Sequence, residues 1–130
     1  MRSQNFVWRK HFLRYYLPLF VWLGVIWMFS AQEGLMVRGE PTLWFLLERK
    51  GAHVVEYFIL AVLFFRVVGL WTKTLVDRTL WTLAWVVWMA TLDETHQFFV
   101  PGREGKPSDV GIDMIGATLG VWASIFFGRK

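Results

Sequence analysis

The sequence predicts an all-α fold: an integral membrane four-helix bundle with a short interfacial helix between the first and second helices. Long apolar segments alternate with short charged ones, and 55% of the 130 residues are hydrophobic. Aromatic residues are far more frequent than in an average soluble protein, with 12 Phe and 9 Trp. A chain of this length is expected to form one domain, residues 1–130. Because there is no cysteine, disulfides, thiolate metal sites and a cysteine nucleophile are excluded.

The first two apolar segments predict helices over residues 13–31 and 51–71. The first follows a basic stretch and is free of charge from Tyr15 to Phe29, which is long enough to span a membrane when the flanking basic residue snorkels. A cleaved signal peptide begins in the same way, but it would need a small residue where Phe29 stands. Between the two helices, residues 41–48 begin with proline and are rich in Leu and Trp, which predicts a short helix lying in the membrane interface.

The last two helices are predicted over residues 79–100 and 109–128. Only 80–92 of the third helix is uncharged, about 20 Å of helix against a hydrocarbon core of about 30 Å. We therefore expect this helix to continue through the carboxylates that follow, as far as the helix-ending Pro101. The fourth helix contains a G-x-x-x-G pattern starting at Gly116, which lets another helix backbone approach closely.

The distribution of Lys and Arg predicts the orientation of the helices. Nine of the 14 basic residues lie at the two termini or around the loop between the second and third helices, and five lie in the other two loops. The positive-inside rule then places both termini in the cytoplasm.

With this orientation, the carboxylates within the last three helices all lie in the outer half of the membrane. Helical spacing places Lys50, His53 and Tyr57 on one face, and it places Asp93 one turn before Gln97. Charge close to hydrocarbon is costly, so these groups must be compensated or used. We expect an outward-facing polar pocket lined by Lys50, His53, Glu56, Tyr57, Asp93, Glu94, Gln97, Arg103, Asp109 and Asp113.

Three groups of residues carry a resemblance to a known family: Lys50-x-x-His53-x-x-Glu56-Tyr57; Asp93-Glu94-x-x-Gln97 with Pro101-Gly102-Arg103; and Asp109 followed by Gly116 and Gly120. In these positions, from about residue 30 to residue 120, the chain resembles the VanZ-like family. Its members are small bacterial integral membrane proteins, and the founding member is associated with low-level resistance to teicoplanin. The resemblance implies a multi-pass protein of the bacterial cytoplasmic (inner) membrane. Asp113 stands where the family usually has Asn, which adds a carboxylate to the pocket.

Binding and catalysis are both open as functions of this pocket. In the binding interpretation, it holds or shields an amphiphilic envelope ligand: a lipid-linked precursor, a lipid head group or a lipoglycopeptide antibiotic. In the catalytic interpretation, the protein is an envelope hydrolase or transferase with Asp93 or Glu94 as general base, His53 as its partner, and Arg103 or Lys50 as anchor for a phosphate or carboxylate. No nucleophile elbow or zinc-type motif selects a reaction, so the sequence leaves open whether the protein is an enzyme.

Two further interpretations concern the same charges. Metal coordination by His53, Glu56, Asp93, Glu94 and Asp109 requires these residues to converge, which spacing alone does not show, so neither a metal site nor a cofactor is assigned. Ion pairs that only hold the helices together explain two or three of the charges, but not six or more on one side. The expected partners are the lipid bilayer and the amphiphilic ligand; a homodimer is left open, and no nucleic acid is expected.

Overall fold

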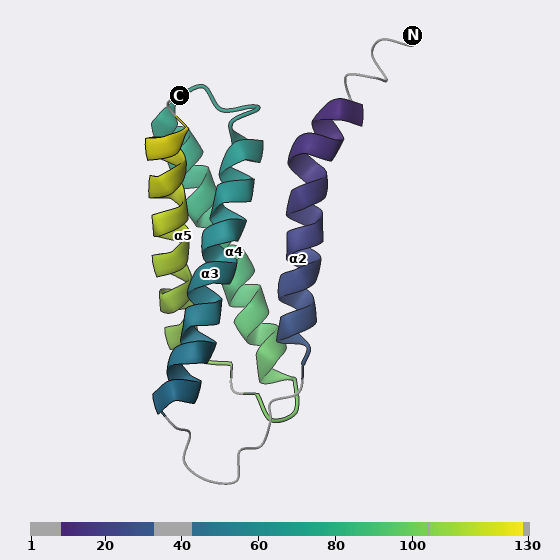
Figure 1. Ribbon diagram of the computed structural model, residues 1–130, viewed down its shortest axis with the longest axis vertical. Helices are drawn as coiled ribbons and strands as arrows, with labels where there is room; N and C mark the ends of the chain where they lie inside the picture. The colour runs from purple at the N-terminus through teal and green to yellow at the C-terminus, as the bar shows by residue number, and fades with distance from the viewer. Residues whose placement is uncertain (1–8, 33–42, 104, 129–130) are drawn as a thin grey trace.

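The computed structural model describes residues 9–32, 43–103 and 105–128, and every regular element in these ranges is a helix. A π-helical segment, η1 (Phe12–Tyr16), leads into α2 (Leu17–Ser30). The chain continues with α3 (Leu43–Val68), α4 (Leu75–Phe98) and α5 (Pro107–Phe127), and successive helices point in opposite directions (Figure 1). The prediction of an all-α protein with four long helices is confirmed.

Three segments are long and apolar enough to cross a membrane: Arg9–Ser30, Arg49–Val68 and Pro107–Phe127. The remaining helix, α4, has the charged residues Asp77 and Arg78 in its first turn and two carboxylates near its end. These charges shorten its apolar middle and lower the mean hydropathy of the helix. Three of the four long helices therefore have the length and apolar composition that were predicted for membrane spans.

The second helix begins earlier than predicted. Residues 43–48, which the sequence assigned to a separate interfacial helix, are instead the first turns of α3, and residues 41–42 lie outside the described ranges. No proline interrupts 43–68, and the segment 43–50 is free of the β-branched residues that disfavour helices. Gly51 does not break the helix.

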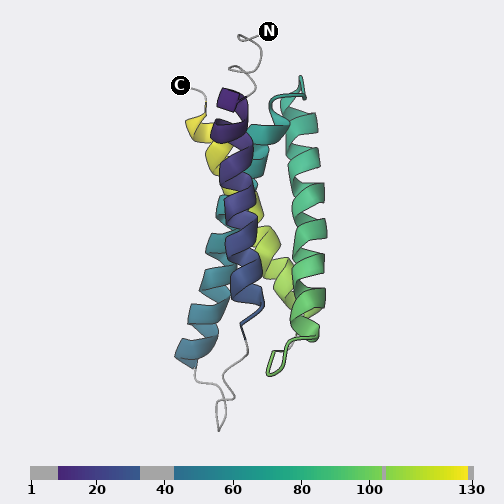
Figure 2. The same cartoon turned by 90° about the vertical axis from the view of Figure 1, so that its right-hand side faces the viewer.

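Helices α3 and α5 form the most extensive contact, and they cross near their middles in the side view (Figure 2). Where the two helices cross, α5 presents two glycines to α3. A Cβ atom at Gly116 would collide with the backbone of Val54, and one at Gly120 would collide with the carbonyl group of Phe58. The expected close approach at the G-x-x-x-G pattern is confirmed, and the helix that approaches is α3 of the same chain.

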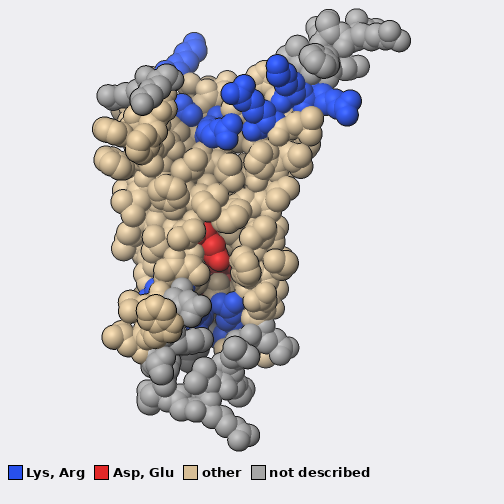
Figure 3. Space-filling model, in the orientation of Figure 1, with Lys and Arg blue, Asp and Glu red and all other residues tan. Residues whose placement is uncertain are grey.

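The outer surface is apolar in its middle and basic at one end. Large hydrophobic side chains such as Phe20, Trp88 and Trp122 are more than half exposed on the outward faces of the helices. Lys and Arg gather at the end formed by the start of η1, the α3–α4 connection and the end of α5, which we call the basic end (Figure 3). The described basic residues there are Arg9, Lys10, Arg14, Arg66, Lys73 and Arg78.

Candidate functional site

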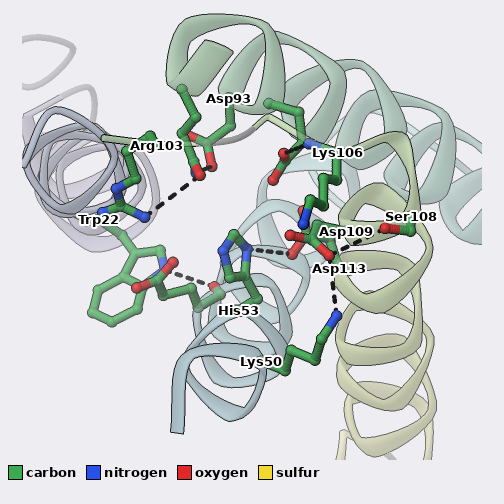
Figure 4. A network of polar contacts seen from close by, with 12 residues as sticks. Trp22, Lys50, His53, Asp93, Arg103, Lys106, Ser108, Asp109 and Asp113 are labelled. Carbon is green, nitrogen blue, oxygen red and sulfur yellow. Dashed lines mark hydrogen bonds and ion pairs between the residues drawn. The ribbon is translucent and has the colours of Figure 1, made fainter. Parts of the chain in front are cut away.

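A buried polar cluster lies between three helices, toward the end opposite the basic end. It consists of His53 from α3, Glu94 from α4 and Asp113 from α5, and one possible ligand atom from each lies within 4.8 Å of the other two. His53 Nδ1 donates a hydrogen bond of 2.9 Å to Asp113 Oδ1. His53 and Glu94 are each 5% exposed, and Asp113 is fully buried. We call these three residues the buried cluster; Figure 4 shows the contact between His53 and Asp113.

Close backbone packing brings the members of the cluster together. Asp113 lies one turn before Gly116, and His53 lies next to Val54, so the glycine contact between α5 and α3 draws the two side chains together. Glu94 is held from the α4–α5 loop, because its Oε2 accepts a 2.7 Å hydrogen bond from the backbone N–H of Lys106. This loop can approach α4 because Gly105 has no Cβ atom, which would otherwise meet the Glu94 carbonyl.

One ion pair lies about a turn from the buried cluster, toward the loop end of the helices. Lys50 Nζ is 3.2 Å from Asp109 Oδ1, and Ser108 Oγ donates a weaker hydrogen bond of 3.4 Å to the same oxygen (Figure 4). The lysine side chain is 46% exposed, whereas that of Asp109 is 10% exposed. Because solvent screens the lysine, we expect this pair to contribute little to stability.

A second chain of contacts links α4 to the end of α2. Gln97 Nε2 donates a 2.9 Å hydrogen bond to Asp93 Oδ2, and Arg103 Nη1 donates one of 3.5 Å to Gln97 Oε1. Arg103 also donates to the carbonyls of Phe29 at 2.6 Å and Gln32 at 3.0 Å. It therefore caps the C-terminal end of α2, where the last carbonyl groups lack the N–H of a following helical turn. The Phe29 carbonyl also accepts a 3.3 Å hydrogen bond from the backbone N–H of Gln32.

The structure brings the predicted site residues to the same end of helices α3, α4 and α5, but it pairs them differently from one expectation. Asp109, which the sequence offered as a metal ligand beside His53 and Glu94, forms the ion pair with Lys50, and Asp113 takes its place in the buried cluster. Tyr57 is buried beside Asp93 and lines a small void of about 70 Å³.

Two neighbouring residues have separate roles. Glu56 is partly buried, and its backbone carbonyl accepts a 2.9 Å hydrogen bond from the indole of Trp22. His96 lies apart from the buried cluster, because its ring stacks on Trp27 of α2 at 4.0 Å and its Nδ1 lies 3.0 Å from Ser30 Oγ.

A pocket of about 270 Å³ borders the cluster on the α2 side. Two arginines, Arg49 and Arg103, belong to its wall, and we call it the arginine pocket. The residues that line it are Phe29, Ser30, Gln32, Arg49, Ala52, His53, Glu56, Gln97 and Arg103. Within the described part of the chain, the buried Nε atom of Arg49 has no hydrogen-bond partner. Burial, and after it the neighbouring Arg49 charge, lower the pKa of Arg103, as expected for two guanidinium groups that share one pocket.

The sequence reasoning missed Arg49, which it counted only as a loop charge. The signal was present: Arg49, His53 and Glu56 stand at positions i, i+4 and i+7, so they share one helical face. The prediction placed Lys50 on a helical face with His53, but it left Arg49 in the loop because the helix was expected to begin near residue 51.

A larger groove of about 480 Å³ borders the cluster on the opposite side, between the end of α4 and the start of α5. Its lining is mainly apolar, and among the described residues that line it, Glu94 is the one that can ionise. The lining residues are Thr91, Glu94, Thr95, Phe98, Phe99, Gly105, Pro107 and Val110. We call this the α4–α5 groove. The buried cluster thus lies between two hollows, with His53 in the wall of the arginine pocket and Glu94 in the wall of the groove.

Comparison with known proteins gives one family assignment. The sequence profile of the VanZ/LLP1 family matches residues 3–128, which is nearly the whole chain. Neither the search of curated proteins nor the search of solved structures gave a match.

Proposed function

The chain belongs to the VanZ/LLP1 family, and from this premise we propose that it is a four-span protein of the bacterial cytoplasmic membrane that binds an anionic amphiphile in its arginine pocket. The basic end carries six of the described Lys and Arg residues, against four at the pocket end. The positive-inside rule therefore supports a cytoplasmic basic end, cytoplasmic termini and a pocket that opens to the outside.

The burial of its polar residues supports α4 as the fourth span. Asp93, Glu94 and Gln97 near its end are covered by the neighbouring helices and the α4–α5 loop, so they do not face lipid. Its outward face instead presents large apolar side chains, among them Trp81 and Trp88. Intramembrane charges that face the interior of a protein are the tolerated kind, and they commonly mark a functional site.

The observation that carries the binding proposal is the pair of guanidinium groups in the arginine pocket. The buried Arg49 Nε has no partner among the described residues, and the Arg49 side chain lines the pocket, which supports its contact with a ligand there. Planar guanidinium groups recognise phosphate and carboxylate groups through paired hydrogen bonds. Arg103 already donates to backbone carbonyls at the end of α2, so Arg49 is the better candidate for direct contact, and Arg103 adds positive charge.

The ligand class follows from the position of the pocket. A head group bound at the outer ends of the helices leaves its hydrocarbon tail at membrane depth, where the apolar surface of the protein or the lipid can cover it. Lipid-linked cell-wall precursors, phospholipids and lipoglycopeptides such as teicoplanin share this combination of an anionic group and an apolar tail. Capture or shielding of such a molecule would link the pocket to teicoplanin-type resistance.

Binding can be tested with a short-chain phosphatidylglycerol added to the detergent-purified protein, followed by thermal unfolding. The anionic lipid is expected to raise the unfolding midpoint, whereas the matching uncharged diacylglycerol is not. Arg49→Gln should weaken binding about tenfold, because it removes one charge-assisted contact of about 1.5–3 kcal/mol, part of which Gln and Arg103 replace. Lys73→Gln, an exposed residue at the basic end, is the matched control. Equal binding by the two variants would contradict the proposal.

An envelope enzyme is the second candidate function, and the buried cluster favours it. Glu94 and His53 meet there as the catalytic interpretation required, whereas Asp93 lies outside the buried cluster. Glu94 is therefore the better candidate base. Mass spectrometry of membrane lipid extracts and lipid-linked precursors incubated with the protein would detect a product. Glu94→Gln should abolish its formation without unfolding the protein, whereas Asp93→Asn should retain part of it. Product formation by Glu94→Gln at the rate of the unaltered protein would exclude this assignment.

A further inference from the structure

We infer that the buried cluster is a binding site for one divalent transition-metal ion of the Zn²⁺ class, with His53, Glu94 and Asp113 as its protein ligands. The inference concerns these three side chains alone, and it does not depend on which amphiphile the arginine pocket holds. It differs from the metal set considered from the sequence, because Asp113 replaces Asp109 and neither Glu56 nor Asp93 takes part.

The geometry is close to that of a three-ligand site. Zn²⁺ binds imidazole nitrogen and carboxylate oxygen at about 2.0–2.2 Å, so tetrahedral coordination separates the donor atoms by roughly 3.4 Å. In the buried cluster, His53 Nδ1 and Asp113 Oδ1 are 2.9 Å apart, and one possible ligand atom from each of the three residues lies within 4.8 Å of the other two. An ion bound at Nδ1 takes the place of the proton that His53 shares with Asp113, and that proton is released to solvent. Small side-chain rotations bring all three within reach of one ion. Each ligand comes from a different helix.

Unpartnered oxygen atoms provide the second observation. Glu94 Oε1 and Asp113 Oδ2 are buried and have no hydrogen-bond partner within the described residues, although each carboxylate has one satisfied oxygen. Buried carboxylate oxygens ordinarily find donors or a metal ion, so two such acceptors in one cluster favour a cation there. Lys50 and Lys106 lie beside the cluster (Figure 4). These lysines are an alternative source of positive charge for the carboxylates. The experiment below must distinguish neutralisation by lysine from neutralisation by a metal ion.

The donor set selects the class of metal. One imidazole and two carboxylates suit Zn²⁺ or Mn²⁺, whereas Ca²⁺ takes six to eight oxygen ligands and Mg²⁺ prefers oxygen in an octahedron. Three protein ligands leave a fourth position for water or for a phosphate oxygen. Because His53 belongs to the wall of the arginine pocket and Glu94 to that of the α4–α5 groove, a ligand in either hollow would lie near the ion.

The experiment measures metal alone. The full chain is purified without a polyhistidine tag, stripped with a chelator, equilibrated with Zn²⁺, Mn²⁺ or Mg²⁺, and separated from free ions by gel filtration. Elemental analysis is expected to find about one Zn²⁺ or Mn²⁺ per chain and no retained Mg²⁺, and Zn²⁺ should raise the unfolding midpoint. His53→Gln, Glu94→Gln and Asp113→Asn should each weaken Zn²⁺ binding by at least about tenfold, since each removes a direct ligand.

The controls are matched in residue type and lie outside the cluster. His96→Gln alters the histidine that stacks on Trp27, and Asp77→Asn alters an exposed carboxylate at the basic end; both should bind Zn²⁺ as the unaltered protein does. Failure of the unaltered protein to retain stoichiometric Zn²⁺ or Mn²⁺ would overturn the inference in favour of lysine neutralisation, whatever the fate of the variants. Equal binding by the controls and the cluster variants would overturn it as well. Neither result bears on lipid binding by Arg49→Gln.

Discussion

Replacing Gly116 with alanine should disrupt the buried cluster from a distance. The added Cβ would lie 3.0 Å from both the Cα and the carbonyl carbon of Val54, and closer still to its carbonyl oxygen. Carbon atoms in contact normally lie about 3.5–4.0 Å apart, so α5 must move from α3 by about 0.5–1 Å. Asp113, one turn away, moves with it. Its 2.9 Å hydrogen bond to His53 then lengthens to about 3.4–3.9 Å, at or beyond the limit for such a bond.

The loss of stability in Gly116→Ala can be compared with that of a matched glycine variant on the same helix. Overpacking of this kind costs about 1–3 kcal/mol. A Cβ at Gly111 meets nothing within 4 Å, so Gly111→Ala should leave stability unchanged or raise it by up to about 1 kcal/mol through helix propensity. Thermal unfolding in detergent gives the comparison, and Zn²⁺ retention reports on the cluster. If Gly116→Ala is as stable as Gly111→Ala and retains Zn²⁺ equally well, the close contact does not position the cluster.

Three further predictions concern orientation, pairing and the attachment of α2. In this cysteine-free chain, Ser108→Cys should react with an impermeant thiol reagent in intact cells and Lys73→Cys only after permeabilisation; the reverse pattern would invert the proposed topology. In thermal unfolding, Lys50→Gln should lower the free energy of unfolding by less than about 1 kcal/mol. Asp113→Ala leaves a buried histidine unpaired and should lower it by about 1–3 kcal/mol; equal losses would contradict the assigned burial. Arg103→Lys should lose hydrogen bonds to the end of α2 and speed amide exchange there; unchanged exchange would show that these bonds do not hold the helix.

The sequence could predict where the polar residues gather, but not which of them pair. Helices α3, α4 and α5 follow one another through short connections and alternate in direction, so residues near the start of α3, the end of α4 and the start of α5 meet at one end. Whether His53 meets Asp109 or Asp113 depends on how far α5 slides along α3. That register is determined by the contact of Gly116 with Val54, two residues 62 positions apart, and helical periodicity carries no information about such a contact.

The start of α3 shows a different limit. The run of charges before residue 51 resembled a loop, because charge counting treats basic residues near a membrane as the end of a span. The helix instead continues outward from the apolar region to Leu43, and the continuation turns Arg49 toward the arginine pocket. A hydropathy boundary marks where the lipid ends, whereas a helix boundary depends on local propensity and capping. The hydropathy boundary and the helix boundary differ here by about two turns of helix. For this reason Arg49 was not predicted to be a pocket residue.

The pairing of the buried charges argues against a purely structural role. If the acids served only to hold the helices together, each should have a full set of partners, since an apolar residue of similar size would otherwise be as stable or more so. Asp109 meets that expectation through Lys50. Asp93 Oδ1, Glu94 Oε1 and Asp113 Oδ2 do not, because no described residue bonds to them. Glu94 lines the α4–α5 groove, and Asp113 bonds to His53, which lines the arginine pocket, so an ion or a ligand there can supply contacts to these two acids. We therefore expect binding, as proposed above, to account for these buried acids better than helix packing alone.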